Sequence, residues 1–282
     1  MNMLTGALLL MGITGTLLGV IIALFARFFK TETDSRIELV QELLPGANCG
    51  GCGKAGCADF AKSVVSGENP PSRCPVSSAE QINAIALALG ISASSGLQKR
   101  AIVRCGGDIF QTVNRLNYNG ISDCNAASLV AGGPKGCLHG CLGLGSCANV
   151  CPFGAIEMVN NLALVHRELC VGCGKCVEVC PRHVIALVPA DAEAHVYCNS
   201  PDKGAAKRKQ CKVACIGCGK CVRTAPELFR LTGALASANY EAEEFPGKEM
   251  VEKVKCPTGA LLTAAEHHFI EKHDPEWEKE EK

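Results

Sequence analysis

The chain opens with a long apolar run. Its first 26 residues, Met1 to Ala26, contain no charged side chain. Folded as a helix, the part from Thr5 onward would be about 33 Å long at about 1.5 Å per residue, enough to cross a bilayer. A signal peptide is the alternative, but the run is too long, no basic residue precedes it, and no small-residue cleavage site comes before the first charges. The sequence therefore predicts an uncleaved transmembrane anchor in residues 1–30.

Basic residues follow this run. Arg27, Lys30 and Arg36 stand at its C-terminal end. Basic residues next to a membrane helix mark the cytoplasmic side. We therefore expect a single-pass protein of the cell (inner) membrane, with the bulk of the chain in the cytoplasm and the lipid bilayer as a partner.

The next segment, residues 31–90, has a helical pattern on either side of a cysteine-rich loop. An amphipathic helix is expected over Asp34–Leu44, ended by a Pro-Gly pair. Ser77 or Ser78 is the expected N-cap of a second helix over Glu80–Leu89, whose apolar positions are typical of packing. This segment is predicted to be a small helical domain.

The centre of the chain changes to short apolar runs. Two of them surround Asn160-Asn161, as in a β-hairpin, and a similar run returns over Pro181–Val188. This internal repeat predicts strands with short helices between them. The expected fold class is therefore α+β: a transmembrane helix, a small helical four-cysteine domain, and ferredoxin-like modules.

Composition adds one outlying number, the 20 cysteines. The 28 basic and 28 acidic residues cancel, so no net charge points to nucleic acid as a partner. The cysteines fall in ligand-type groups with glycines between them, which favours metal binding and a reducing compartment over disulfides.

In residues 136–190 the spacing is that of a protein with two [4Fe–4S] clusters. Three closely spaced thiolates hold one cube, and the cysteine before a proline reaches across to the other. One expected ligand set is Cys151, Cys170, Cys173 and Cys176. The other is Cys137, Cys141, Cys147 and Cys180.

A third cluster is expected in the helical domain. Its ligands would be Cys49, Cys52, Cys57 and Cys74, where the glycines allow tight turns around the sulfurs. A structural zinc site with four thiolates is the alternative for each of these sets.

The last third, residues 191–266, has the pattern of a degenerate ferredoxin-like module with one cluster. Ala225 stands where a crossover cysteine is expected, and residues 240–246 replace the second cysteine triplet. The ligands that remain are Cys215, Cys218, Cys221 and Cys256. We therefore expect three [4Fe–4S] clusters in the preceding segments and a fourth in this one. A charged tail follows over residues 267–282.

Four cysteines match no cluster spacing. Cys105 and Cys124 lie in the connecting segment 91–135, where a pair of buried or neighbouring thiols is the simplest interpretation. Cys198 and Cys211 are left over as free thiols or as part of an undefined site.

Together, the N-terminal apolar run and the segments Asn48–Cys57 and Gly133–Phe153 resemble the B subunit of the Rnf (Rsx) complexes. These are membrane-bound, ion-translocating ferredoxin:NAD⁺ oxidoreductases. The resemblance covers the chain to about Val188, and longer members extend beyond it. It implies a chain without a self-contained active site that takes electrons from reduced soluble ferredoxin. It also implies electron transfer to membrane and flavin-bearing partner subunits, for NAD⁺ reduction coupled to Na⁺ or H⁺ movement.

Two other functions compete with this one. The first is an iron–sulfur subunit of another membrane oxidoreductase, and the second is a membrane-bound redox or metal sensor with structural zinc. The sequence has no acid–base pair, nucleophile or nucleotide loop that would point to chemistry outside its cofactors.

Overall fold

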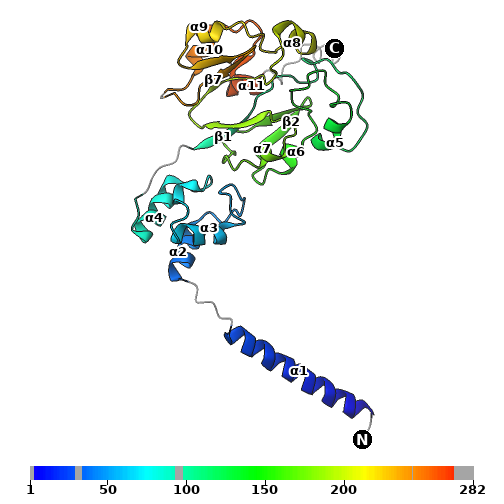
Figure 1. The fold of residues 1–282 in the computed structure, drawn as a ribbon, viewed down its shortest axis with the longest axis vertical. Helices are drawn as coiled ribbons and strands as arrows, with labels where there is room; N and C mark the ends of the chain where they lie inside the picture. The colour runs from blue at the N-terminus through cyan, green and yellow to red at the C-terminus, as the bar shows by residue number, and fades with distance from the viewer. Residues whose placement is uncertain (1–2, 29–33, 93–97, 243, 270–282) are drawn as a thin grey trace, which may run out of the picture.

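In the computed structural model the described residues are 3–28, 34–92, 98–242 and 244–269. The elements follow one another along the length of the molecule (Figure 1). Helix α1 lies at one end, a small helical module follows it, and two modules that combine strands with short helices lie at the other end.

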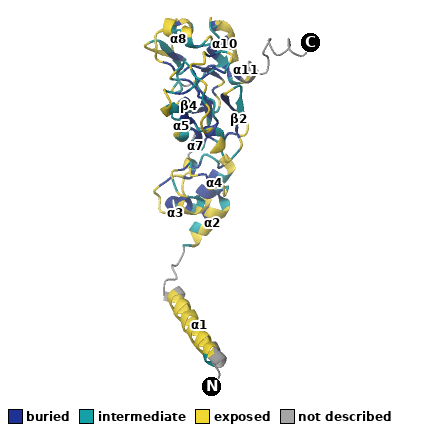
Figure 2. Cartoon of the chain, turned by 90° about the vertical axis from the view of Figure 1, so that its right-hand side faces the viewer, coloured by how far each residue is buried: buried dark blue, intermediate teal, exposed yellow. Residues whose placement is uncertain are grey.

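Helix α1 (Met3–Phe28) coincides with the expected anchor. Its apolar side chains are largely exposed, Met11 to 74% and Leu10 to 68%, and Figure 2 shows this exposure along most of the helix. Among the described residues, however, no helix is both long enough and apolar enough to cross a membrane. The expected transmembrane span is therefore not confirmed by the structure.

The helical module consists of α2 (Ser35–Leu43), α3 (Cys57–Val65), the 3₁₀ turn η1 (Pro71–Arg73) and α4 (Ala79–Leu89). Val40, Phe60 and Ile85, one from each α-helix, are almost completely buried in its core. Of the two serines predicted as N-cap of α4, Ser77 and Ser78, the structure uses Ser78, which forms a capping box with Gln81. Both predicted helices of this segment are thus confirmed.

The second module contains the predicted hairpin, formed by β2 (Ile156–Val159) and β3 (Leu162–Val165). Asn160 and Asn161 both have positive φ angles, 47° and 57°, as a tight hairpin turn requires. The short helices α6 (Ser146–Asn149) and α7 (Lys175–Val179) carry cysteines at either side of the hairpin.

The run after Cys180 forms β4 (Ile185–Pro189), whose partner comes from far away in the sequence. Strand β1 (Lys99–Val103) pairs with it antiparallel, Val103 opposite Ile185. The connecting segment therefore contributes a strand to this module, followed by helix α5 (Cys124–Leu129).

The third module repeats this plan. Its hairpin is β6 (Phe229–Thr232) with β7 (Leu235–Ala238), and its long-range pair is β5 (Ala194–Val196) with β8 (Leu261–Thr263). The helices are α8 (Gly204–Gln210), α9 (Lys220–Thr224), α10 (Lys248–Val254) and α11 (Ala264–Phe269). The second and third modules thus each combine one local hairpin with one pair of strands distant in sequence, as the α+β class predicts.

Candidate metal centres

The helical module gathers four thiols around one loop. Cys49, Cys52 and Cys74 are buried and Cys57 is half-buried. The Cys57 amide, at the start of α3, donates to Asn48 Oδ1 at 2.8 Å, which closes the loop onto itself. All four expected ligands of this set therefore lie in the same small module.

A second set lies between the β2–β3 hairpin and α7. Cys151, Cys170, Cys173 and Cys176 line one pocket together with apolar side chains such as Phe153 and Ile156. Backbone amides point at two of the sulfurs: Ala101 N–H donates to Cys170 at 3.3 Å and Ala155 N–H to Cys151 at 3.4 Å. The structure thus brings together all four cysteines that the spacing assigned to this cube.

The pKa of one thiol in this set reflects its surroundings. Burial, together with the neighbouring thiols of Cys170, Cys173 and Cys151, raises the pKa of Cys176 to about 12. Without metal the Cys176 thiol is therefore protonated at neutral pH. Metal binding must release this proton.

The third set departs from the expected composition. Cys141, Cys147 and Cys180 line one pocket as expected, and the fourth cysteine of its lining is Cys124. Burial is the main cause that raises the pKa of Cys147 to about 12, and Cys124 is the first of the neighbouring thiols that contribute to this value. Cys137 does not line this pocket.

The position of Cys124 is fixed by hydrogen bonds. Its amide donates to Ser146 Oγ at 2.7 Å, and that hydroxyl donates to Asp123 Oδ2 at 2.9 Å. Sequence reasoning left Cys124 without a role because it stands far from the other three cysteines and in no spacing motif. Its placement depends on the hydrogen bond that joins the first residue of α5 to the first residue of α6.

The fourth set lies in the third module. Cys215, Cys218, Cys221 and Cys256 line one pocket, as predicted. Burial raises the pKa of Cys256, but backbone amides of Thr258 and Leu261 outweigh it and the pKa is lowered. Ala225, at the missing crossover position, is buried among apolar side chains of this module.

The donor chemistry of these sets fits iron–sulfur clusters. Each set offers four thiols, and the pockets of the second and third modules are lined mainly by apolar groups. An all-cysteine set is the usual ligation of a [4Fe–4S] cluster, and amides that face the sulfurs help to set its potential. In the described part of the chain, no three His, Cys, Asp or Glu side chains are placed as ligands of a single metal ion.

Two family models match the cysteine-bearing parts of the chain. The model described as "Putative Fe-S cluster" matches residues 44–76, and the "LdpA Fe-S cluster-binding domain" matches residues 145–191. The first match contains the whole thiol set of the helical module, and the second contains the β2–β3 hairpin with the thiols around it. Both matches identify the chain as an iron–sulfur protein.

Three curated relatives cover most of the chain, and each is the B subunit of a membrane complex. That of the proton-translocating ferredoxin:NAD(+) oxidoreductase complex of Clostridium ljungdahlii is 44% identical over 76% of this chain and 76% of its own length. That of the Na(+)-translocating ferredoxin:NAD(+) oxidoreductase complex of Acetobacterium woodii is 42% identical over 73% of this chain and 62% of its own. The B subunit of the ion-translocating oxidoreductase complex of Methanosarcina acetivorans is 36% identical over 91% of this chain and 94% of its own length.

The match to the Methanosarcina acetivorans subunit, over 91% of this chain, includes the modules that carry all four thiol sets. Electron transfer through bound clusters is the chemistry that such sets provide. The chain belongs to the B-subunit family of the Rnf-type, ion-translocating ferredoxin:NAD⁺ oxidoreductase complexes, as an iron–sulfur electron-transfer subunit of the complex.

Proposed function

We propose that this chain takes single electrons from reduced soluble ferredoxin and passes them to membrane and flavin-bearing subunits. There they serve NAD⁺ reduction coupled to Na⁺ or H⁺ translocation. The donor and acceptor are those in the names of the relatives. The chain's own contribution is a series of thiol sites in adjacent modules.

The closeness of successive sites carries this proposal. Burial is the main cause of the raised pKa of Cys173, and the thiol of Cys49 in the preceding module adds to it. In the same way Cys176 adds to the raised pKa of Cys147 in the next set. The loops of the first two sets are also in contact, since a Cβ atom on Gly51 would lie 2.9 Å from the carbonyl oxygen of Cys173. Thiols of successive sets thus lie near one another, as a relay of single electrons needs.

We further propose which residues hold the cofactors. The expected sets with Cys49, with Cys151 and with Cys215 each hold one [4Fe–4S] cluster, and Cys141, Cys147 and Cys180 hold another. When bound, such a cluster accepts and releases one electron. The protein supplies burial, amide hydrogen bonds to sulfur and fixed separations.

Residues 1–30 are proposed as the membrane attachment, with the remaining modules on the cytoplasmic side. The charge-free sequence to Ala26, the exposed apolar side chains of α1 and the basic residues that follow support this. Deletion of residues 1–30 should move the chain from the membrane to the soluble fraction, with its iron content unchanged. Continued sedimentation of the shortened chain with membranes, in the absence of its partner subunits, would contradict the assignment.

The relay is tested with the full chain purified without oxygen. Iron and acid-labile sulfide are counted, and reduced ferredoxin is mixed with the chain while the visible absorbance of the clusters is followed. We expect iron and sulfide in equal amounts and bleaching by ferredoxin. Iron without sulfide, or zinc in its place, would refute the proposal, as would a loaded chain that ferredoxin cannot reduce.

The identity of the partners is tested by affinity purification from solubilised membranes. Flavin-bearing and multi-span subunits are expected to copurify. A molybdenum or nickel catalytic subunit in their place would instead assign the chain to another oxidoreductase.

A further inference from the structure

Four cysteines lie outside the thiol pockets of the second and third modules and outside the helical module. They are Cys105, Cys137, Cys198 and Cys211. Three of them, Cys105, Cys198 and Cys211, match no cluster spacing in the sequence. Distances from two neighbouring glycines, Gly107 and Gly140, show which of these sulfurs lie close together.

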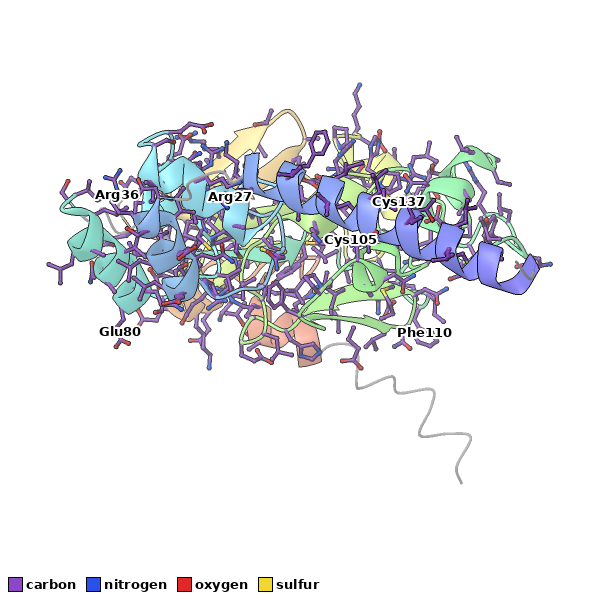
Figure 3. The ribbon with its side chains drawn as sticks, turned by 90° about the horizontal axis from the view of Figure 1, so that it is seen from below. Arg27, Arg36, Glu80, Cys105, Phe110 and Cys137 are labelled. Carbon is purple, nitrogen blue, oxygen red and sulfur yellow. The ribbon has the colours of Figure 1, made fainter. Side chains whose placement is uncertain are left out.

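Gly140 and Gly107 mark where these thiols converge. A Cβ atom on Gly140 would lie 3.3 Å from the sulfur of Cys105 and 3.5 Å from that of Cys137. A Cβ atom on Gly107 would lie 3.3 Å from the sulfur of Cys211 and 3.7 Å from that of Cys105. Cys105 thus lies near both Cys137 and Cys211, and Figure 3 shows Cys105 and Cys137 next to each other.

The fourth thiol, Cys198, faces the same place. Burial is the main cause of the raised pKa of Cys137, and the thiols of Cys105 and Cys198 add to it. Burial likewise raises the pKa of Cys211 to about 12, with Cys105, Cys137 and Cys198 as the neighbouring thiols. Each of these two thiols therefore interacts with the other members of the group.

Backbone hydrogen bonds hold the four segments together. Gly106 N–H donates to Tyr197 O at 3.0 Å, which joins the residues next to Cys105 and Cys198. Val113 N–H donates to Gln210 O at 3.0 Å, and Gly136 N–H donates to Val113 O at 2.7 Å. The cysteines are thus presented by a fixed framework, and Cys141 N–H donates to the sulfur of Cys105 at 3.4 Å.

Three cations lie close to this group: two buried lysines and the partly buried Arg182. Lys135 and Lys207 are each only 2% exposed, donate to backbone carbonyl oxygens, and have no ion-pair partner among the described residues. The buried Nε of Arg182 has no hydrogen-bond partner there, and its guanidinium lies close to the thiols of Cys137 and Cys180.

A buried cation is costly unless an opposite charge compensates it. Thiols and disulfides are neutral and would leave the two buried lysines, and the buried Nε of Arg182, uncompensated. Thiolates around a metal cluster are negative, and they would also accept a hydrogen bond from Arg182. The charge distribution therefore favours an anionic, metal-loaded site over two disulfides.

We propose that Cys105, Cys137, Cys198 and Cys211 hold a fifth four-iron cube, and that Cys124 joins Cys141, Cys147 and Cys180 as the fourth ligand of the neighbouring one. This inference rests on the proposed iron–sulfur function. It places all 20 cysteines in five sets of four. The ferredoxin-type spacing fails here because Cys137 turns toward the third module.

The fifth site also explains how the last site is connected. Cys105 and Cys137 precede or belong to the second module, whereas Cys198 and Cys211 open the third. Burial raises the pKa of Cys198, and the nearby thiol of Cys215 adds to this. The fifth set thus lies between the second module and the set around Cys215, so that the sites of the two modules form one series.

The first test is the metal content of the intact chain. Purified without oxygen and reconstituted with iron and sulfide, it should contain about 20 irons and about 20 sulfides, since each cube holds four of each. About 16 of each would overturn the fifth site and leave the proposed relay standing. Absence of sulfide would overturn both, and zinc bound in addition to about 16 irons would overturn the fifth cluster.

The second test compares single and double cysteine variants. For each variant, EPR and Mössbauer spectroscopy give the number of four-iron clusters that are lost or converted to three-iron clusters. Cys105→Ser, Cys137→Ser and their double variant should all affect the same single cube. Cys137→Ser combined with Cys180→Ser should affect two cubes. Under ferredoxin-type pairing the second pair would affect only one, and that result would overturn the assignment.

Cys218→Ser is the matched control, because it makes the same substitution at an exposed ligand of another set. It should affect one cube, and combined with Cys137→Ser it should affect two under either assignment. This shows that the count is additive across separate sites. Cys124→Ser should affect the same cube as Cys180→Ser, and an unchanged spectrum of Cys124→Ser would overturn its role.

Discussion

Gly51 lies directly against the backbone of Cys173. A Cβ atom on Gly51 would come within 2.9 Å of the carbonyl oxygen of Cys173, and also within 2.9 Å of the Pro75 ring. The loop of the first thiol set therefore touches the loop of the second set, although the two belong to different modules. The φ angle of Gly51 is one that other residues can adopt. Glycine is required here because any side chain would collide with Cys173 and Pro75.

Gly51→Val should separate the two modules without removing a ligand. The added side chain overlaps with backbone atoms, and overpacking of this kind costs about 1–3 kcal/mol. We expect unchanged iron and sulfide content, weaker contact between the modules, and slower passage of electrons from one thiol set to the next. Stopped-flow reduction by ferredoxin measures the rate.

Gly247→Val is the control for this substitution. There a Cβ atom would approach only the Glu193 carboxylate, at 3.7 Å. Its reduction kinetics should match the wild type. Equal kinetics in Gly51→Val would show that electrons do not pass through this contact.

Ser146→Ala should destabilise the position of Cys124. The substitution leaves the buried Cys124 amide without its acceptor, which costs about 1–3 kcal/mol. We expect a lower melting temperature and faster loss of one cluster to a chelator. Ser128→Ala removes a hydroxyl that bonds only to its own helix, at Asn125 O, and should change neither quantity. Equal chelation rates in both variants would contradict the role of Ser146.

Local signals in the sequence predicted the local structure well. The Asn160-Asn161 turn, the Ser78 cap and the triplet around Cys173 each depend on residues within a few positions, and the structure contains all three. Their physics is short-range: positive φ, amide capping and a loop that wraps one pocket. Such features can be read without knowledge of the tertiary fold.

Long-range partners could not be predicted in this way. Strand β1 pairs with β4 more than 80 residues later, and Cys124 joins thiols on three other segments. Neither relationship leaves a spacing in the sequence. The expectation for Cys137 failed to anticipate its surroundings for the same reason, because a ferredoxin motif fixes neighbours in sequence and not the approach of a third module.

Restoring the missing crossover cysteine should not restore a cluster. Ala225→Cys places a small thiol among apolar side chains, where it behaves like a small hydrophobic residue. The missing triplet leaves it without co-ligands, so iron content should stay unchanged and stability should change by less than about 1.5 kcal/mol. Iron quantitation and thermal unfolding measure both.

Ala225→Leu is the comparison, because the same position is only 6% exposed and cannot accept a larger side chain without overpacking. Ala225→Leu should lower the melting temperature clearly. Any iron that it loses should come from the set around Cys215, which lies in the same module. Additional iron and sulfide in Ala225→Cys would contradict the assignment of a single cluster to this module.

Acid stability should depend on His195. This imidazole is fully buried, and burial together with the Arg167 guanidinium lowers its pKa to about 3. An Arg167 N–H donates to His195 Nε2 at 3.1 Å, so Nδ1 carries the hydrogen and donates to the Tyr240 hydroxyl at 2.8 Å. Below pH 6.5 the unfolded chain binds a proton here that the folded chain rejects. Stability should therefore fall as pH decreases from about 6.5 toward 3, by at most about 1.4 kcal/mol per pH unit.

The pH dependence of the melting temperature tests this. Loss of clusters in acid affects all variants alike, so the difference between variants reports on His195. His195→Gln keeps a polar side chain but does not titrate, so it should lower stability at pH 7.5 and flatten the decline between pH 6.5 and 5. If His195→Gln loses stability in acid as steeply as the wild type, protonation of His195 does not limit acid stability.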